Sequence, residues 1–350
     1  MKILMTGVDE NRFGGMWTVA NNYICNSKYN KEVDLTYVAT STNGSIIKRT
    51  CLMLKAFIKI KSILSKKQTD IVHIHMAEKG STFRARIITK IAKKYNVKVV
   101  IHLHAGPFMD WYSTLNEKKK NQIKELFDLS DKVLVLGNFW KEQLAALVKK
   151  NKIEVLYNGV KVPSSNKYNI NGKYITFMGV LKKTKGIYDL IDAIKLIDKE
   201  LPKNIIVKVC GIDLEGNVQE YINSHNLEKR IELAGWVDEK KRKTIYANTV
   251  INVLPSYYEA LSMTVIESMA NGIPIITTNI STMNEMLDDK ELLIDTGNVK
   301  ELSEKLLLFI NSQSKRKNVS KRIYKRAKEL FSEEEMINNT LKIYSKVASK

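Results

Sequence analysis

Two glutamates, Glu259 and Glu267, stand with seven residues between them in the segment whose residue types most suggest chemistry. The apolar run at 250–254 predicts a strand before them, and Gly272 marks the expected end of a helix after them. A second apolar strand is expected at 274–278. Glu259 therefore falls in a loop, and Glu267 falls in the early part of the helix.

The start of that helix is a candidate site for negative charge. The first backbone amides of a helix have no partner inside it, and such amides bind anions. Here they belong to Ser262, Met263 and Thr264. Two carboxylates beside an anion site suit a ligand with both hydroxyls and phosphates, such as a sugar nucleotide. The alternative interpretation is that the two glutamates are ordinary surface residues on either side of a helix start, without a role in binding.

A glycine pair, Gly14 and Gly15, follows the apolar strand expected at 2–6 and precedes a helical pattern. Glycines let a ligand approach the backbone closely, and the next helix offers free amides. An ordinary turn is the alternative for this pair on its own. The sequence contains no G-x-G-x-x-G pattern, which argues against a dinucleotide redox cofactor.

A basic loop follows the strand expected at 173–179. It begins at Gly179, and its lysines are Lys182, Lys183 and Lys185. Lysines in such a loop can neutralise the phosphates of a ligand. A solvated loop is the alternative.

Two histidine pairs stand at the ends of apolar segments, His73 with His75 and His102 with His104. Residues two apart on a strand share a face, and the carboxyl ends of parallel strands border the crevice where ligands bind. The spacing permits a zinc site. However, the acids lie far away in sequence and no third ligand is evident, so we expect no metal. Structural packing is the alternative for each histidine.

Apolar segments alternate with helical patterns along the whole chain. We expect strands near 2–6, 33–40, 70–75, 98–104, 132–136 and 153–156, and again near 173–179, 204–211, 231–234, 250–254, 274–278 and 292–294. Such alternation predicts right-handed β-α-β crossovers and parallel sheets. Two sets of strands predict an α/β protein of two doubly wound, Rossmann-like domains.

The polar, turn-rich segment 157–172 separates the two sets and is the expected linker. We therefore predict an N-terminal domain at 1–158 and a second domain at 159–331. The remaining residues, 332–350, predict a final helix that begins with the acidic run after Ser332.

Length and composition set further bounds. The chain has 350 residues, no apolar run of 18 residues and three isolated cysteines, which fits a two-domain protein without a membrane span in a reducing cytosol. No signal-peptide pattern is present. We expect a cytoplasmic location.

The formal charge of +20 lies mainly in the first half, where residues 1–160 hold 27 basic and 13 acidic side chains. A basic half could face nucleic acid, anionic lipid or an acidic acceptor. The sequence contains no nucleic-acid-binding signature that would support nucleic acid as the partner. The helical stretches 49–64 and 84–98 could rest on an anionic membrane, although apolar faces of this kind more often cover a sheet.

The segment around the two glutamates resembles the E-x7-E region of the retaining family-4 glycosyltransferases, which have the GT-B fold of two Rossmann-like domains facing a cleft. The resemblance covers roughly 1–350 and is strongest in 173–280. It implies that a sugar moves from a nucleoside diphosphate sugar to an acceptor hydroxyl with its anomeric configuration retained. A front-face, oxocarbenium-like route is the usual proposal for this family.

The resemblance implies roles for individual residues. Glu267 would accept hydrogen bonds from the donor ribose, and Glu259 would orient the sugar. Lys185 and the amides of 262–264 would stabilise the diphosphate. His104 would contact the transferred sugar from the other domain, although the following Ala105 leaves His102 as a rival.

Three further segments match the resembled family less closely. Gly14 and Gly15 match the Gly-Gly of its first loop, near the donor diphosphate and the acceptor. Gly179 matches a Gly-Arg pair, but Val180 stands where the arginine is usual, so Lys182 or Lys183 would have to compensate. Val237 ends a Gly-x-Val strand whose backbone contacts the nucleobase; the neighbouring Trp236 could stack on the base or pack between the domains.

Partners and cofactors follow from the same resemblance. The donor would be a nucleotide sugar, and the acceptor a glycan or lipid-linked sugar of cell-surface polysaccharide or glycolipid synthesis, reached at the inner face of the cell membrane. The sequence has no D-x-D triplet, so we expect no metal cofactor. The rival functions are a sugar-nucleotide 2-epimerase on the same fold and a non-catalytic basic module that binds membrane or nucleic acid.

Overall fold

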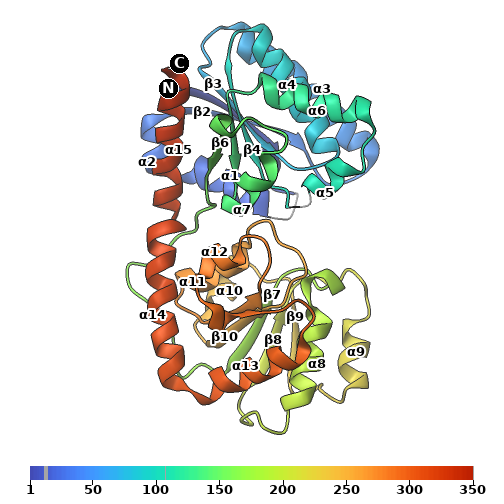
Figure 1. Cartoon of the computed structure of the whole chain (residues 1–350), viewed down its shortest axis with the longest axis vertical. Helices are drawn as coiled ribbons and strands as arrows, with labels where there is room; N and C mark the ends of the chain where they lie inside the picture. Colours follow the sequence, from blue (N-terminus) through green and yellow to red (C-terminus); the bar gives the residue numbers. More distant parts are fainter. Residues whose placement is uncertain (12–14, 107, 350) are drawn as a thin grey trace. The chain divides into compact units, whose positions relative to one another are not determined.

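The computed structural model describes residues 1–11, 15–106 and 108–349. It divides into two compact units, Met1–Gly159 with Glu333–Lys350, and Val160–Ser332. Each unit contains one six-stranded sheet whose paired strands are all parallel. Figure 1 shows helices on both faces of each sheet. The predicted α/β class with two Rossmann-like domains is therefore confirmed.

The N-terminal sheet has the strand order β2-β1-β3-β4-β5-β6. Its strands are β1 (Lys2–Val8), β2 (Asp34–Ser41), β3 (Ile71–Met76), β4 (Lys98–Leu103), β5 (Lys132–Val135) and β6 (Ile153–Val155). The chain adds β2 on one side of β1 and β3 on the other. The carboxyl ends of these strands therefore form a topological switch point, which is where ligands bind in open α/β sheets.

The helices of this unit are α1 (Gly15–Cys25), α2 (Ser27–Glu32), α3 (Ile46–Ser65), α4 (Gly80–Lys94), α5 (Phe108–Ser113), α6 (Glu117–Leu129), α7 (Asn138–Leu144), the short 3-10 helix η1 (Lys150–Lys152) and α15 (Glu333–Ala348). On one face of the sheet, buried residues of α3, α4, α6 and α7 pack against alternate strand residues such as Val72 and Ile101. The opposite face carries the histidines.

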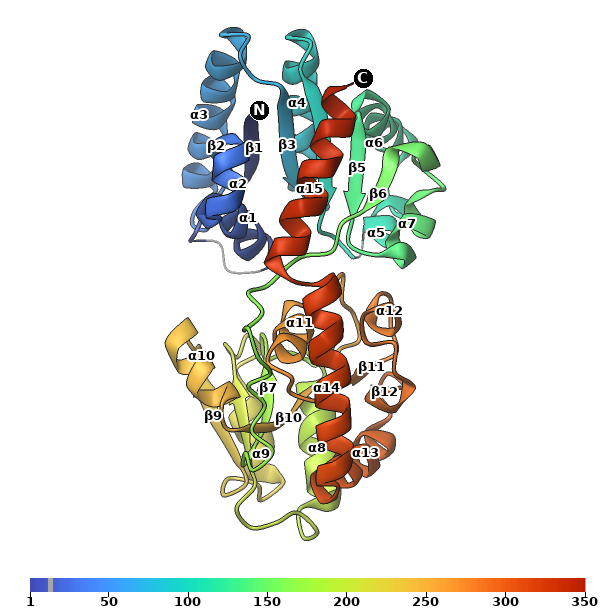
Figure 2. The same ribbon diagram turned by 90° about the vertical axis from the view of Figure 1, so that its left-hand side faces the viewer.

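Helix α15 covers that opposite face together with α1 and α2 (Figure 2). Its Tyr344 hydroxyl lies 2.5 Å from His73 Nδ1 and 3.3 Å from the hydroxyl of Tyr29. Thr340 lies 2.8 Å from the Tyr23 hydroxyl. These hydroxyl contacts are buried, so the last helix of the chain is an integral layer of the first unit.

The C-terminal sheet has the order β12-β11-β10-β7-β8-β9. Its strands are β7 (Tyr174–Met178), β8 (Ile206–Cys210), β9 (Ile231–Gly235), β10 (Thr249–Leu254), β11 (Ile275–Thr278) and β12 (Leu293–Ile294). The surrounding helices are η2 (Lys183–Lys185), α8 (Ile187–Ile197), α9 (Val218–Ser224), α10 (Glu239–Tyr246), α11 (Met263–Ala270), α12 (Met283–Leu287), η3 (Lys290–Leu292), α13 (Val299–Asn311) and α14 (Gln313–Leu330). All twelve strands in the described part of the chain lie where the sequence predicts them.

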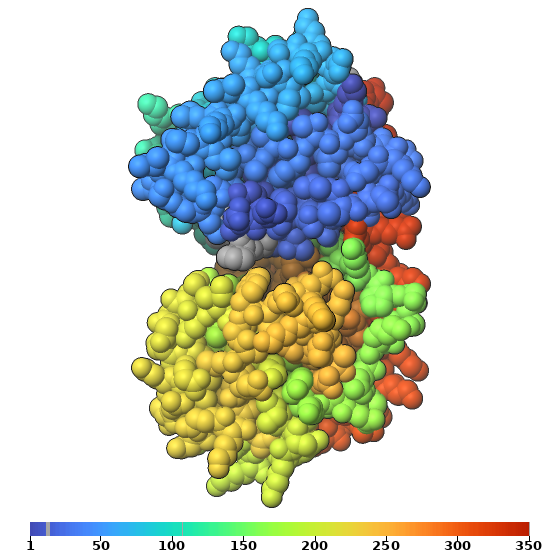
Figure 3. Space-filling view, turned by 180° about the vertical axis from the view of Figure 1, so that it is seen from behind, coloured from blue at the N-terminus to red at the C-terminus, as the bar shows by residue number. Residues whose placement is uncertain are grey.

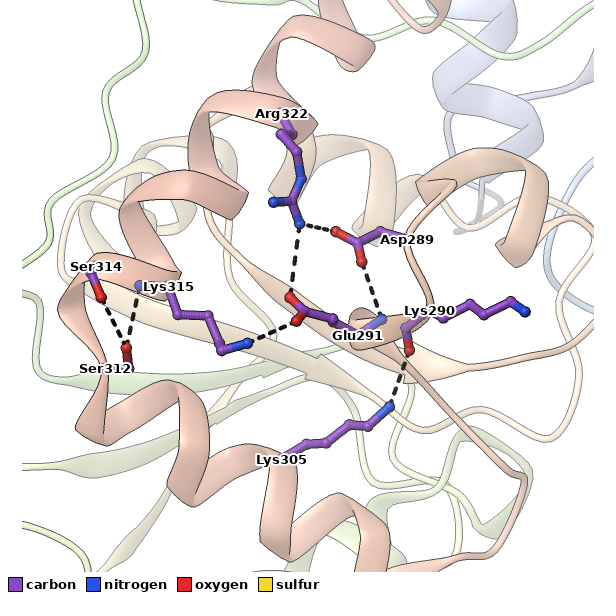
Figure 4. Close-up of polar contacts among 8 residues, drawn as sticks. All are labelled: Asp289, Lys290, Glu291, Lys305, Ser312, Ser314, Lys315 and Arg322. Carbon is purple, nitrogen blue, oxygen red and sulfur yellow. Dashed lines mark hydrogen bonds and ion pairs between the residues drawn. The ribbon is translucent and has the colours of Figure 1, made fainter.

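A group of polar contacts joins α14 to the segment before β12 (Figure 4). Arg322 pairs with Asp289, and Lys315 Nζ lies 2.8 Å from Glu291 Oε1. Arg322 and Glu291 are more than one-third exposed, so each pair adds little stability by itself. Together they connect α14 to the segment 289–291.

Candidate functional site

The residues predicted to bind the donor lie at the carboxyl ends of two neighbouring strands, β7 and β10. These strands pair in parallel, with Asn252 opposite Thr176, so the loops that follow them start at the same edge of the sheet. The two segments are tied together by backbone contacts. The Tyr257 N–H donates to Thr184 O at 3.0 Å, and the Thr264 hydroxyl donates to Met178 O at 3.0 Å.

Lys185 and Glu259 meet within this pair of loops. Lys185 Nζ lies 2.5 Å from Glu259 Oε1, and the Ser256 hydroxyl donates to the same oxygen at 2.9 Å. Glu259 is only 8% exposed, whereas a quarter of the Lys185 side chain is accessible. The acid therefore fixes the amine in a position where phosphate oxygens could compete for it.

Gly186 is required for this approach. Its φ is +72°, and a Cβ there would lie 2.1 Å from Pro255 O. Any other residue would push the lysine loop away from the segment that carries Glu259.

The start of α11 carries the backbone amides of the predicted anion site. The first helical bond runs from the Ile266 N–H to Ser262 O at 3.1 Å, and the Ser262 hydroxyl caps Val265 at 3.4 Å. Within the described chain, the amides of Met263 and Thr264 have no acceptor. They lie in the same connection after β10 as Glu259, at a helix N-terminus where the dipole favours negative charge.

Glu267 lies in α11 and faces α10. Its carboxylate accepts a hydrogen bond from the Tyr246 hydroxyl at 3.4 Å and lies 3.5 Å from Arg242 Nη1. Burial raises the pKa of Glu267, and the Arg242 charge opposes that rise. Arg242 and Tyr246 are not among the residues predicted from the sequence. Their spacing of four residues on one helix was the available signal, and many helices show it.

The remaining donor-side candidates surround this group. Gly179 and Val180 follow β7 and are half-buried. Val237 packs against a small buried cluster that includes Met178 and Tyr246, so its position is fixed by the same core as Glu267. Trp236 is 57% exposed.

In the N-terminal unit, Gly15 begins α1 and lines a cavity of about 520 Å³. Its predicted partner Gly14 lies outside the described residues. His104 follows β4, and its N–H donates to Met76 O at 2.8 Å. The sequence did not reveal which side chains form the rest of this cavity, because they come from four separate segments.

All four strand histidines meet on one face of the N-terminal sheet. His75 is the register partner of His102, His75 Nδ1 lies 2.7 Å from His104 Nε2, and the ring centroids of His73 and His75 are 4.7 Å apart. Burial lowers the pKa of each, to about 3 for His75. The cluster is therefore neutral at pH 7.

The sequence argument that no third metal ligand exists was wrong. His73, His75 and His102 each offer a ring nitrogen, and these nitrogens lie within 4.8 Å of one another. Consecutive parallel strands with histidines two apart should have indicated this grouping. The rings of His73 and His75 are stacked, with an interplanar angle of 15°. Tyr23 and Tyr344 pack against His73. Among the described residues, His73 Nε2, His75 Nε2 and both ring nitrogens of His102 are buried without a hydrogen-bond partner.

Comparison with known proteins adds independent findings. The family model described as "Glycosyltransferase Family 4" matches residues 21–162, and the one described as "Glycosyl transferases group 1" matches residues 161–326. An uncharacterized glycosyltransferase of Methanocaldococcus jannaschii is 26% identical, over 99% of both chains. An Escherichia coli UDP-Gal:α-D-GlcNAc-diphosphoundecaprenol α-1,3-galactosyltransferase is 27% identical, over 66% of this chain and 63% of that protein.

Solved structures share the fold. The sucrose-phosphate synthase of Thermosynechococcus elongatus superposes with a TM-score of 0.81 at 14% identity, covering 99% of both chains. The Anabaena protein HepE, solved in complex with UDP and glucose, superposes with a TM-score of 0.75 at 14% identity, covering 99% of this chain and all of that one. At these identities the likeness shows the architecture alone.

The neutral histidine cluster predicts an acid-sensitive N-terminal unit. An unfolded histidine titrates near pH 6.5, so between that pH and the lower folded pKa the unfolded state binds more protons and stability falls as the pH falls. For each histidine, the free energy of unfolding falls by roughly 1.4 kcal/mol for each pH unit by which the pH drops within this window. His102→Gln should therefore reduce the pH dependence of the unfolding free energy, measured by urea denaturation between pH 4 and 7.

Ile74→Val is the matched control, because it removes one buried methyl group from the same sheet without a titratable group. It should lower the unfolding free energy by about 0.5–1.5 kcal/mol equally at each pH. Parallel pH profiles for His102→Gln and the wild type would contradict the neutral state of the cluster.

Proposed function

We propose that this chain, a glycosyltransferase of the GT-B fold by its two family matches and its architecture, transfers a sugar from a nucleoside diphosphate sugar to an acceptor hydroxyl with retention of anomeric configuration. The observation that carries the proposal is the grouping of Lys185, Glu259 and the free amides of Met263 and Thr264 at one edge of the second sheet. Binding of a diphosphate requires cations and amide donors, and binding of a sugar in one orientation requires a carboxylate that is held in place.

The similar proteins support the choice of substrates. One similar structure was solved with UDP and glucose, and one relative is named for transfer from UDP-Gal to a diphosphoundecaprenol-linked sugar. Another relative is named as an O-antigen chain mannosyltransferase. We therefore propose a role in cell-surface polysaccharide or glycolipid synthesis, with a glycan or lipid-linked acceptor.

The proposed step breaks the bond between the sugar C1 and the diphosphate oxygen and forms a bond from C1 to the acceptor oxygen. The acceptor proton passes to the departing phosphate. Lys185 and the α11 amides stabilise the charge that grows on the diphosphate. Glu259 orients the sugar, Glu267 binds the ribose, and His104 contacts the transferred sugar. We assign no metal ion to the step, because lysine and amides supply the positive charge.

The direct test is incubation of the purified protein with a panel of nucleotide sugars and of glycan and lipid-linked acceptors in EDTA, with products identified by mass spectrometry. A new glycosidic bond whose anomeric configuration matches the donor is expected. Activity that disappears in EDTA and returns with Mg²⁺ or Mn²⁺ would contradict the metal-free step. Absence of any transfer with or without metal would contradict the function.

Two substitutions should separate binding of the donor from the chemical step. Lys185→Ala should lower kcat, because its charge is needed most when the diphosphate departs. Glu267→Ala should instead weaken donor binding roughly 10- to 100-fold, as expected for loss of a charge-assisted hydrogen bond. Steady-state kinetics and calorimetric titration of the donor measure the two effects.

Lys182→Ala and Lys183→Ala are the matched controls for Lys185. Both lie in the same loop, and neither contacts Glu259 in the structure, so their effect on kcat should be smaller. A strong effect at one of them would identify the cation that replaces the arginine absent at Val180. Equal, small effects at all three lysines would mean that the loop is only solvated surface.

We also propose that α3 holds the protein on an anionic membrane. Among the described residues, no helix combines the length and the apolar character needed to span a bilayer. One face of α3 is buried, as the sequence predicted, but a second apolar stripe faces solvent, which the sequence analysis did not foresee. Ile47, Leu54 and Ile58 are 77%, 53% and 72% exposed, at helical spacing on one side.

The charges around the stripe suit anionic lipid. Neither α3 nor α4 contains an acidic residue, and Lys48, Lys55 and Lys59 flank the exposed stripe on α3. Figure 3 views the N-terminal unit from the side on which this early part of the chain, coloured blue, forms much of the surface. Each lysine near an anionic surface contributes about 1 kcal/mol, less at high salt, so reversible binding is expected.

Vesicle sedimentation tests this attachment. The wild type should sediment with anionic vesicles at low salt and less at high salt, and Ile58→Ser should weaken the binding. Leu196→Ser is the matched control, since Leu196 is 59% exposed on α8 of the other unit. Equal partitioning with neutral and anionic vesicles, or equal loss in the control, would exclude α3 as the attachment surface.

A further inference from the structure

Four of the five histidines of the chain meet on one face of the N-terminal sheet, and the proposed transfer uses only His104 among them. His73 and His75 share a face of β3, because residues two apart on a strand point the same way. Strand β4 pairs with β3 and places His102 directly opposite His75. The exposed fractions of His73, His75 and His102 are 0%, 3% and 0%, so these three imidazoles form a buried group.

The three buried rings leave nitrogens unpaired at one place. Among the described residues, His73 Nε2, His75 Nε2 and both ring nitrogens of His102 have no hydrogen-bond partner. One nitrogen from each ring lies within 4.8 Å of those of the other two. Buried polar atoms in native proteins are normally paired, so unpaired nitrogens gathered from three rings indicate a ligand that contacts all three.

Hydrogen bonds at the opposite nitrogens orient two of the rings. His73 Nδ1 lies 2.5 Å from the Tyr344 hydroxyl, and His75 Nδ1 lies 2.7 Å from His104 Nε2. A neutral imidazole that donates through Nδ1 carries a lone pair on Nε2. Histidines that bind a metal usually have this arrangement, because a hydrogen bond at the second nitrogen fixes both the ring and its tautomer.

A cation fits this group better than a water molecule does. Neutral His102 adds a third lone pair, on whichever of its two nitrogens is unprotonated. A water molecule can donate only two hydrogens, whereas a divalent transition metal accepts lone pairs from three nitrogens at once. The group consists of imidazoles alone, and imidazole suits Zn²⁺ and similar metals, whereas Mg²⁺ and Ca²⁺ prefer oxygen ligands.

We propose that His73, His75 and His102 bind a Zn²⁺ ion inside the N-terminal unit, with Tyr344 as the residue that positions His73. Three imidazoles leave one tetrahedral position for a small ligand such as water. The ion joins β3 to β4 and, through the Tyr344 hydroxyl, connects both strands to α15. It stabilises the folded unit, because the three ligands come together only in the fold. The inference goes beyond the proposed function and does not depend on it.

Calorimetric titration with Zn²⁺ tests the site on the full chain after a chelator has been used and dialysed away. We expect one ion per chain. His102→Gln should weaken its binding by more than the roughly 10- to 100-fold that is typical of losing an outer-shell partner. His225→Gln is the matched control, because His225 is the fifth histidine and follows α9 in the other unit. It should leave the affinity unchanged.

X-ray absorption spectroscopy of the Zn²⁺-loaded wild type tests the ligands without any substitution, so the result does not depend on whether a variant at buried His102 folds. We expect three imidazoles with Zn–N distances of about 2.0–2.1 Å. A shell that contains sulfur at about 2.3 Å would assign the ion to cysteine, such as the exposed Cys25 or Cys51. That result, or a shell of oxygen alone, would overturn the proposal.

Tyr344→Phe tests the positioning of His73. It removes the hydroxyl and keeps all three ligands, so we expect three imidazoles and a Zn²⁺ affinity lowered roughly 10- to 100-fold. Tyr23→Phe is the matched control, because the Tyr23 hydroxyl contacts Thr340 at 2.8 Å while its ring packs on His73. Equal losses of affinity in the two variants would overturn the role of Tyr344.

Thermal unfolding shows whether the ion stabilises the fold. Zn²⁺ in large excess over its Kd should raise the Tm of the wild type and of His225→Gln, and should not raise that of His102→Gln. Circular dichroism before heating checks that each variant is folded. An equal rise with Mg²⁺ would overturn the assignment to a nitrogen site. Absence of Zn²⁺ binding in the wild type would overturn the inference and leave the proposed function intact.

Discussion

Parallel pairing of β7 with β10 is the constraint on which the candidate donor site depends. Because paired parallel strands end at the same edge, Lys185 and Glu259 meet at 2.5 Å although they are 74 positions apart. The left-handed Gly186 allows the approach, since its hydrogen lies against Pro255 O. The helix N-terminus after β10 then adds amides to the same edge. The charge arrangement of the site is therefore a consequence of strand order.

The two units use the same architecture for different electrostatic environments. In the second unit the lysine is neutralised by a nearly buried glutamate, so a ligand must compete with an existing ion pair for it. In the first unit Arg49 and Lys79 line a cavity with one acid beside them.

Burial of the four strand histidines shows how the fold sets their chemistry. His73, His75 and His102 are fully buried in the sheet, where Tyr23 and Tyr344 pack against His73, and the pKa of these three histidines and of the half-buried His104 is lowered. His104 is consequently a neutral imidazole whose Nε2 lies 2.7 Å from His75 Nδ1.

The strands, the fold class and the segments that carry Glu259, Glu267 and Lys185 could be predicted from the sequence, because alternating apolar periodicity and the glycines that end elements are local signals. The remaining features became visible only in the folded chain. It paired Glu267 with Arg242 and Tyr246, grouped four histidines, turned Ile58 to solvent and assembled the cavity around Arg49. These relations depend on sheet register and on which face of each helix is covered, and neither is encoded within a single short segment of the chain.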